Sequence, residues 1–226
     1  MSDPIEFSKE IEKLIGRNNS RKYYRFRETR FYGGCATADC VGCNLRCVYC
    51  WAQKQVWNTT GNYKMYTPKQ VSERLISMNQ SLVRISGGEP TLCKAHLIEI
   101  IRKIPKNKLF ILETNGILLN DVYLEDLSVF ENLYIRISLK GVDSKSFERI
   151  TGAAGIFFEN QLKALKLLKK YGIKHRAAII PDLFKKEQII GLGIPNLEFE
   201  SLIIYPFVKK NLAERGFKFF KKQYKV

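Results

Sequence analysis

Three cysteines that lie close together in the sequence are candidate metal ligands. Cys43, Cys47 and Cys50 occur in the stretch "CNLRCVYC", with three and then two residues between them. Five of the six cysteines in the chain fall between Cys35 and Cys50. A disulfide framework would spread its cysteines to link distant segments, and a chain of 226 residues does not need such links. We therefore expect reduced thiols that bind a metal.

The number of thiolates that bind distinguishes two kinds of metal site. Cys40 precedes Cys43 with two residues between them, so Cys40 and the three cysteines of the stretch match a four-cysteine zinc site. Three thiolates alone would bind three irons of a [4Fe–4S] cluster and leave the fourth iron open to another ligand. We favour the cluster, because a glycine-rich second motif and a strand–helix repeat accompany the cysteines. Cys35, Cys40 and Cys93 are then expected to be buried structural residues.

The surrounding elements must hold this loop in place, and hydrophobic periodicity predicts them. Strands are expected at residues 35–42, 81–86, 108–113, 132–139, 174–180 and 197–205. Helices are expected at residues 5–16, 67–79, 92–104, 119–128, 144–150, 157–171 and 183–191. The strands read as apolar on both faces, which is typical of a parallel sheet covered by helices.

The alternation of six strands with helices predicts an α/β fold built from β–α–β units. A closed eight-fold barrel usually needs about 250 residues, so we expect a partial (β/α)6 barrel. It would form a single domain over residues 1–226, with its core at about 35–205, a short N-terminal helix and a basic C-terminal extension.

Four polar or glycine-rich stretches follow successive predicted strands. The cysteine loop follows the first strand, "SGGEP" (86–90) the second, "ETNG" (113–116) the third and "SLKG" (138–141) the fourth. In parallel α/β sheets the ligand sits at the carboxyl ends of the strands. The sequence therefore predicts that these four stretches meet at one mouth of the barrel.

The cysteine spacing, with Tyr49 before the last cysteine, resembles the signature of the radical S-adenosylmethionine (radical SAM) superfamily. The stretch at residues 87–90 is similar to the superfamily's second motif, and the resemblance covers about residues 35–205. It implies a [4Fe–4S] cluster held by Cys43, Cys47 and Cys50, with S-adenosylmethionine chelating the open iron. "ETNG" and "SLKGVD" further resemble stretches of glycyl-radical-enzyme activases.

The resemblance also implies which residues contact S-adenosylmethionine: Tyr49, Gly87, Gly88, Glu89, Glu113, Ser138 and Lys140. Tyr49 would pack beside the adenine, and Glu113 and the glycine backbone would meet the methionine amine. Lys140 would meet the methionine carboxylate, whereas Ser138 stands where the activases often have an acid near the ribose. Lys140 could also be a surface residue that merely caps its strand.

The formal charge of +16 is concentrated in three segments. Residues 17–30 carry six Lys or Arg and one acid, residues 161–176 carry six and none, and residues 205–226 carry seven and one. Such blocks suit a polyanion such as RNA. A lysine-rich solvated surface, as in heat-adapted proteins, is the structural alternative. The tail aromatics Phe217, Phe219, Phe220 and Tyr224 alternate with lysines and could stack on bases, or belong to an element that closes the barrel.

These observations predict an enzyme that cleaves S-adenosylmethionine reductively and abstracts hydrogen from a substrate. The substrate would be RNA, as in tRNA modification, or alternatively a protein partner that acquires a glycyl radical; a non-catalytic metal-binding module is the third alternative. A ferredoxin- or flavodoxin-type protein would donate the electron. The sequence has no run of 18 apolar residues and no signal peptide at its start, so we expect a soluble cytoplasmic protein without a membrane partner.

Overall fold

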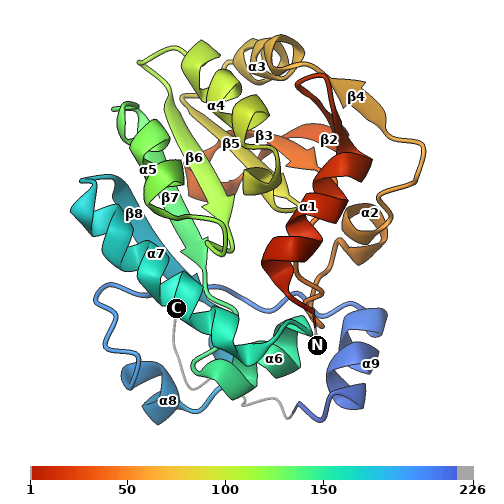
Figure 1. The fold of residues 1–226 in the computed structure, drawn as a ribbon, viewed down its shortest axis with the longest axis vertical. Helices are drawn as coiled ribbons and strands as arrows, with labels where there is room; N and C mark the ends of the chain where they lie inside the picture. The colour runs from red at the N-terminus through yellow and green to blue at the C-terminus, as the bar shows by residue number, and fades with distance from the viewer. Residues whose placement is uncertain (1, 218–226) are drawn as a thin grey trace.

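One curved sheet organises the computed structural model, which describes residues 2–217. Six of its strands are parallel neighbours and run in chain order from β3 to β9. They are β3 (Cys35–Cys40), β5 (Leu82–Gly87), β6 (Leu109–Thr114), β7 (Leu133–Ser138), β8 (Lys174–Ile179) and β9 (Glu198–Phe199). The sheet does not close on itself within the described residues, so the predicted partial (β/α)6 barrel is confirmed (Figure 1).

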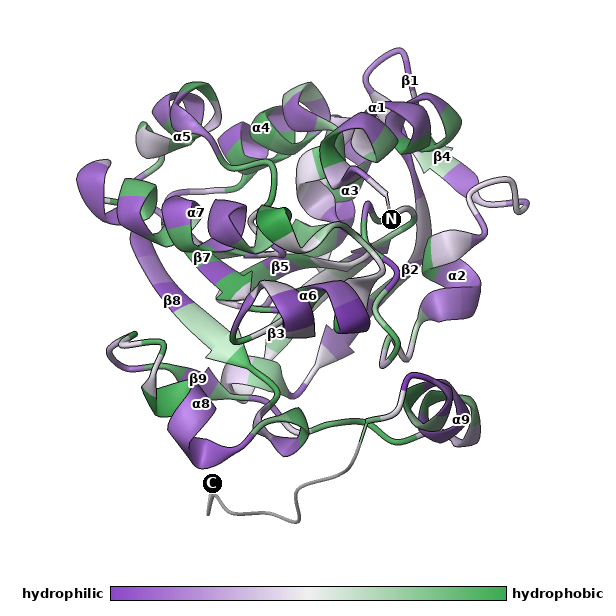
Figure 2. Cartoon of the chain, turned by 60° about the horizontal axis from the view of Figure 1, so that its bottom comes forward, coloured by the Kyte–Doolittle hydropathy of each residue, from purple (hydrophilic) through white to green (hydrophobic). Residues whose placement is uncertain are grey.

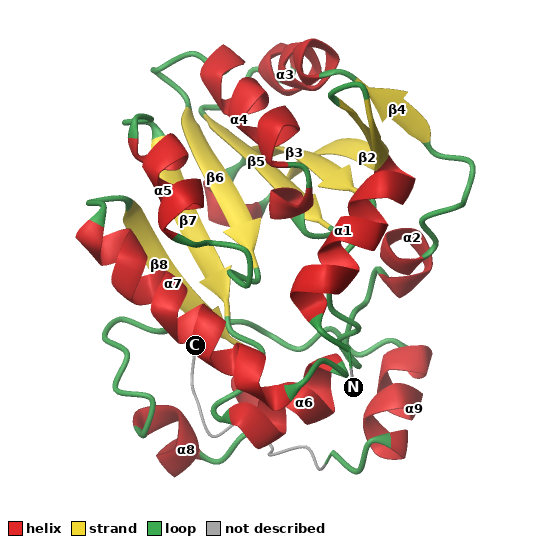
Figure 3. Ribbon diagram, viewed as in Figure 1, coloured by secondary structure: helices red, strands yellow, loops and turns green. Residues whose placement is uncertain are grey.

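Helices connect the parallel strands and cover the outer face of the sheet (Figure 3). The α-helices are α1 (Pro4–Ile15), α2 (Gln53–Trp57), α3 (Pro68–Ser77), α4 (Lys94–Lys103), α5 (Asp121–Ser128), α6 (Ser144–Thr151), α7 (Phe158–Lys170), α8 (Lys186–Ile190) and α9 (Pro206–Glu214). Short 3-10 turns are η1 (Phe31–Gly33), η2 (Pro90–Leu92), η3 (Gly155–Phe157) and η4 (Pro181–Leu183). Asp3 caps α1 and Thr67 caps α3 through a capping box, which explains why both helices begin where the sequence predicts.

An antiparallel extension that we did not predict widens the sheet beside β3. Strand β2 (Ser20–Thr29) pairs antiparallel with β3, and β1 (Gly16–Arg17) and β4 (Lys64–Tyr66) pair with β2. We interpreted residues 17–30 only as a basic block, although their alternating pattern is that of a strand. At the other edge the predicted strand 197–205 is wrong in length, because β9 ends at Phe199 and the chain then crosses to α9.

The two faces of the sheet differ in polarity. Ile85, Leu112 and Ile137 lie on the outer face and are buried under the helices. Because side chains alternate along a strand, Arg84, Glu113 and Arg136 point to the inner face, where they contact one another. The prediction that the strands are apolar on both faces is therefore wrong: the inside of the barrel is polar.

Candidate cluster and cofactor site

The cysteine loop leaves the carboxyl end of β3 and is pinned against α6. The backbone N–H groups of Arg46 and Val48 donate to the carbonyl oxygens of Thr151 and Ile150, at 3.0 and 2.9 Å. Cys47 is buried, and Cys43 and Cys50 are half-buried. The loop therefore presents its three thiols from a fixed backbone.

The environment of these thiols suits iron–sulfur ligation. Burial raises the pKa of Cys43 to about 12 and those of Cys47 and Cys50 to about 11. Glu89 adds to the effect at Cys43, whereas Lys140 opposes it at Cys47 and Cys50. Thiolates here consequently need a cation nearby. No three His, Cys, Asp or Glu side chains in residues 2–217 are arranged to hold a single metal ion. A cubane cluster binds each cysteine to a different iron, so its ligands need not converge on one point.

The other three cysteines are part of the core. Cys35, Cys40 and Cys93 are 0, 0 and 5% exposed, as predicted. Cys40 points to the face of β3 opposite to Asp39, and burial raises the pKa of its thiol to about 11, although the nearby Arg21 opposes this. Cys40 thus belongs to the packing of the sheet, which argues against the four-cysteine zinc set.

The glycine motif at the end of β5 lies directly against the cysteine loop. The N–H of Gly88 donates to the carbonyl of Cys40 at 2.8 Å, and the N–H of Glu89 donates to that of Gly42 at 2.7 Å. A Cβ on Gly88 would lie 2.1 Å from the Gly42 oxygen, so no side chain fits there. Gly87 has φ +88°, a conformation that favours glycine. Both glycines are required for this close contact between the two loops.

The carboxylate of Glu89 connects strand ends. It is 2% exposed and accepts hydrogen bonds from Thr91 (N and Oγ1), Thr114 Oγ1 and the N–H of Asn115, at 2.6–3.1 Å. Asn115 Nδ2 in turn donates to Asn44 Oδ1 at 2.7 Å. The side chain of Glu89 therefore connects the ends of β5 and β6 to the cysteine loop. Contact with the methionine amine, which the resemblance implied for this motif, would be left to the backbone of Glu89.

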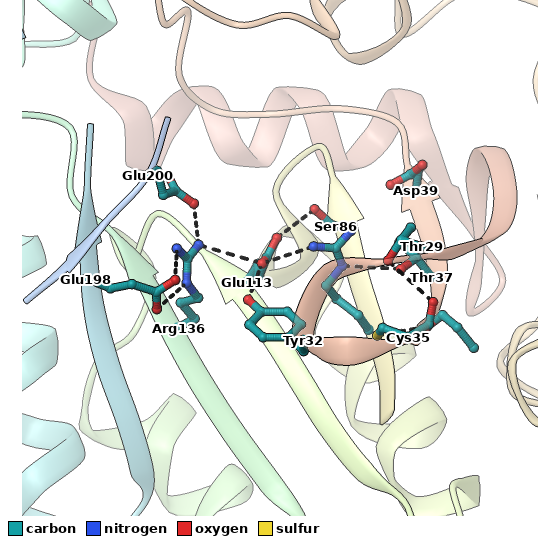
Figure 4. Close-up of polar contacts among 12 residues, drawn as sticks. Thr29, Tyr32, Cys35, Thr37, Asp39, Ser86, Glu113, Arg136, Glu198 and Glu200 are labelled. Carbon is teal, nitrogen blue, oxygen red and sulfur yellow. Dashed lines mark hydrogen bonds and ion pairs between the residues drawn. The ribbon is translucent and has the colours of Figure 1, made fainter. Parts of the chain in front are cut away.

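Glu113 lies inside the barrel at the centre of a charged network (Figure 4). It accepts hydrogen bonds from Tyr32 at 2.6 Å, Ser86 at 2.9 Å and Arg84 at 3.2 Å. Burial alone would raise the pKa of Glu113, but Arg84, Tyr32 and Arg136 outweigh it and hold the pKa below its ordinary value. Protein groups therefore already surround this side chain, and its contact with the methionine amine stays a prediction.

Arg136 extends the network toward the edge of the sheet. Its guanidinium contacts Glu198 at 2.8 and 3.1 Å and also bonds to Glu200 (Figure 4). Arg84 and Arg136 are 4 and 6% exposed at their side chains, whereas Glu198 and Glu200 are 35 and 31% exposed. Sequence reasoning missed this network, because its members come from strands far apart in the chain.

The structure brings together three of the predicted cofactor residues beside β7. Lys140 Nζ donates to Ser138 Oγ at 2.7 Å and lies 5.6 Å from the centroid of the Tyr49 ring. Burial alone would lower the pKa of Lys140, but the nearby Tyr49, Cys47 and Glu200 raise it above its ordinary value. Lys140 is thus a charged, half-buried group at the barrel mouth, and the surface-lysine alternative does not describe it.

Two buried polar residues that we did not predict hold the strand-end loops. Arg21 is 1% exposed and donates to the carbonyls of Pro90, Glu89 and Val41 at 2.6, 2.7 and 3.1 Å. Gln161 of α7 is fully buried, donates to the carbonyls of Asn115 and Ser138, and accepts from the N–H of Lys140. Both lie in the basic blocks, where the sequence suggested only a charged surface.

Comparison with known families now decides the class of the protein. The model of the radical SAM superfamily matches residues 39–189, which contain the cysteine loop and the glycine motif. The chain belongs to the radical SAM superfamily. Members use a [4Fe–4S] cluster and S-adenosylmethionine, and the donor set and glycine contact described above fit both groups. It is therefore an iron–sulfur enzyme by family.

Two curated relatives of this chain are both named GTP 3′,8-cyclase. The GTP 3′,8-cyclase of Clostridium perfringens strain SM101 is 30% identical over 183 residues, covering 78% of this chain and 55% of the relative. The GTP 3′,8-cyclase of Synechocystis sp. is 33% identical over 135 residues, covering 58 and 40%. The chain spans about half the length of the curated relatives it matches.

Solved structures agree on the fold. SuiB of Streptococcus suis, bound to its precursor peptide SuiA, superposes with a TM-score of 0.59 at 18% identity, covering 79% of this chain and 46% of SuiB. TYW1 with a bound lysine–pyruvate adduct gives 0.54 at 22% identity, covering 80 and 71%. At such identities the likeness concerns the radical SAM fold alone. None of the helices between residues 2 and 217 has the length and apolar character of a membrane span.

Proposed function

We propose that this chain cleaves S-adenosylmethionine reductively and uses the resulting radical to abstract hydrogen from a nucleic-acid substrate. The observation that carries the first step is the contact between the cysteine loop and Gly88 at the mouth of the barrel. When bound, the cluster and S-adenosylmethionine would supply the chemistry, which is one-electron reductive cleavage of the sulfonium to methionine and a radical that can take a hydrogen atom from the substrate.

The residues of this chain would bind, orient and shield these groups. Cys43, Cys47 and Cys50 would each hold one iron, and the backbone at Gly87 and Gly88 would approach the methionine amine. Lys140, charged and held by Ser138, would pair with the methionine carboxylate. Tyr49, 8% exposed, would keep water from the cofactor. A ferredoxin- or flavodoxin-type reductant would supply the electron.

Fewer basic side chains are free to bind RNA than the charge count suggests. In residues 17–30, Arg21 is buried, Arg25 and Arg27 bind the carboxylate of Asp39, and Lys22 donates to the carbonyl of Thr59. Helix α7 carries the second block on the side of the sheet away from β2 and α9 (Figure 1). Within residues 2–217 the three blocks therefore do not form one track. Arg25 of the first block does lie with Tyr205 and Phe207, at the start of the third, around a pocket beside the cysteine loop.

A protein partner is the second candidate. The segment after β9 exposes Ile203, Ile204 and Tyr205 by 43, 53 and 46%, and Figure 2 shows this connection to α9 largely in the hydrophobic colour. Exposed apolar residues in a row are typical of protein contacts. SuiB, which shares the fold, has been solved with a peptide. Activation of a glycyl-radical enzyme would be one form of this function.

Anaerobic reconstitution tests the proposal. The chain should incorporate one [4Fe–4S] cluster and release 5′-deoxyadenosine with dithionite as reductant; absence of that product would remove the proposed chemistry. RNA binding should depend on salt, with the logarithm of affinity falling at a slope of roughly −4 for six phosphates on a single strand. A dissociation constant above about 100 μM at physiological salt, or equal binding to heparin, would leave the protein partner as the better candidate.

A further inference from the structure

A surface pocket of about 520 Å³ lies beside the cysteine loop. Its walls come from β2, α2 and the start of α9, whereas Ser138 is the last residue of β7 and Lys140 follows that strand. The lining residues are Tyr24, Arg25, Trp51, Lys54, Gln55, Tyr63, Tyr205 and Phe207. The volume is within the range of sites that bind small ligands.

The lining combines flat aromatic faces with positive charge. The Arg25 guanidinium lies 5.6 Å from the centroid of the Tyr24 ring and 5.8 Å from that of Trp51. Trp51 and Tyr205 are 38 and 46% exposed, so both have free surface. None of the described side chains that line the pocket is acidic. Aromatic side chains stack on bases, and Arg or Lys side chains bind phosphates. Proteins that bind single-stranded nucleic acid combine these two interactions.

A β-bulge directs Tyr24 toward the cofactor loop. The register between β2 and β3 shifts between Tyr23 and Arg25, so Tyr24 is the extra residue. Bulges of this kind re-aim a side chain and occur next to active sites. The Tyr24 hydroxyl would lie 3.0 Å from a Cβ on Gly87, and it is buried without a hydrogen-bond partner in residues 2–217. The Tyr24 ring thus separates the pocket from the glycine motif.

A second buried atom without a partner in the described part of the chain belongs to Asp39 of β3, the residue whose carboxylate binds Arg25. Asp39 is fully buried, and its Oδ2 accepts from Arg25 and Arg27 at 2.7 and 2.8 Å, but its Oδ1 has no partner among the described residues. Unpaired buried polar atoms are unfavourable. Asp39 thus holds the Arg25 side chain at the edge of the pocket through Oδ2.

We propose that this pocket binds one unpaired nucleotide of an RNA substrate. The base stacks on Trp51 and Tyr205, and its phosphate lies at Lys54 and Arg25. Asp39 binds only the Nε of Arg25, whose side chain is 40% exposed, so the outer guanidinium nitrogens remain available. A planar base can enter a concave aromatic pocket more readily than a flat protein surface can. Lys209 and Lys210 on α9 are exposed and could bind the neighbouring phosphates. The inference rests on the proposed function, because a nucleotide here lies beside both motifs that would generate the radical.

Fluorescence anisotropy with a labelled, unstructured RNA of about ten nucleotides and the reconstituted protein tests this site. Tyr205→Ala should weaken binding about 5- to 150-fold, the cost of one lost base stack, and Tyr205→Phe should restore it. Lys54→Ala should reduce the magnitude of the salt slope by about one. The matched controls are Ile156→Ala, which removes another exposed apolar side chain, and Lys145→Ala, which removes another exposed charge; neither should change affinity or slope.

Three other outcomes would contradict the proposed nucleotide site. Equal losses in Lys54→Ala and Lys145→Ala would mean binding by charge alone. Displacement of the RNA by GTP at equal concentration would assign the pocket to a free nucleotide, and no RNA binding together with binding of a flavodoxin would assign it to the reductant. Because anisotropy does not require cofactor cleavage, a protein that binds RNA but releases no 5′-deoxyadenosine would refute the proposed chemistry and leave the pocket intact.

Discussion

The guanidinium of Arg21 donates to the carbonyl oxygen of Glu89 at 2.7 Å, from strand β2 to the loop after β5. The same side chain holds the carbonyls of Val41 and Pro90, so one buried cation joins the cysteine loop to the glycine motif. Arg21→Met should lower the free energy of unfolding by about 2–5 kcal/mol, because it leaves buried carbonyls without a donor. Urea unfolding measures this. Arg17→Met, at an exposed position, is the control and should be nearly neutral.

The cysteines should separate into two groups. Ala at Cys43, Cys47 or Cys50 should abolish incorporation of the cluster, because each thiolate binds a different iron. Cys40→Ala and Cys93→Ala, both in the core, should keep it. Iron content and the visible absorption of reconstituted protein distinguish the groups. Loss of the cluster in Cys40→Ala at unchanged far-ultraviolet circular dichroism would mean that a fourth thiolate participates.

Gly88 should tolerate no side chain. Gly88→Ala places a Cβ 2.1 Å from the carbonyl oxygen of Gly42, the residue before Cys43, so the loops must move apart. We expect at least tenfold less cluster per chain or a Tm reduced by several degrees, since overpacking of this kind costs about 1–3 kcal/mol or more. Gly191→Ala, whose nearest atom lies at 3.3 Å, is the control. A Gly88→Ala protein with normal iron content and Tm would show that the contact is dispensable.

Lys140 should contribute to cofactor affinity. Lys140→Ala removes the charged donor beside Ser138 and Tyr49 and should weaken S-adenosylmethionine binding about 10- to 150-fold, from about 1.5–3 kcal/mol per charge-assisted bond. The cluster spectrum should stay the same. Calorimetric titration gives the dissociation constant, with the exposed Lys163→Ala as control. Equal constants for wild type and Lys140→Ala would exclude a contact with the carboxylate.

Glu113 should make stability depend on acid pH. Its folded pKa is lower than its unfolded value, so its stabilising contribution is present above the unfolded pKa, about 4.3, and is lost as pH falls through the lowered folded pKa. Glu113→Gln should therefore be less stable than wild type at pH 7, and the difference should shrink as the pH approaches 3. Urea unfolding at a series of pH values measures this. A difference that does not change with pH would mean that the charge of Glu113 contributes nothing.

The chemistry of the site could be predicted from the sequence because its signals are local. The spacing of Cys43, Cys47 and Cys50 within one loop, and the glycines that alone allow two loops to touch, need no knowledge of distant residues. The strand–helix alternation likewise follows from short-range periodicity, which predicted the six parallel strands and the strand ends where the motifs lie. Strand β9 was predicted too long because the apolar run at residues 202–205 leads to α9 instead of extending the sheet.

Only the tertiary structure decided where the charged residues belong. A count of Lys and Arg does not distinguish a solvated side chain from Arg21 and Arg25, which bond to groups 14 to 69 positions away. The pairing of Arg84 with Glu113, and of Arg136 with Glu198, depends on strand register across the sheet. Register is set by hydrogen bonds between neighbouring strands, whose residues lie far apart in the chain. No local sequence pattern therefore reveals it. The sequence therefore determined the cluster loop, whereas the fold determined what surrounds it: a charged barrel interior and an aromatic pocket beside the loop.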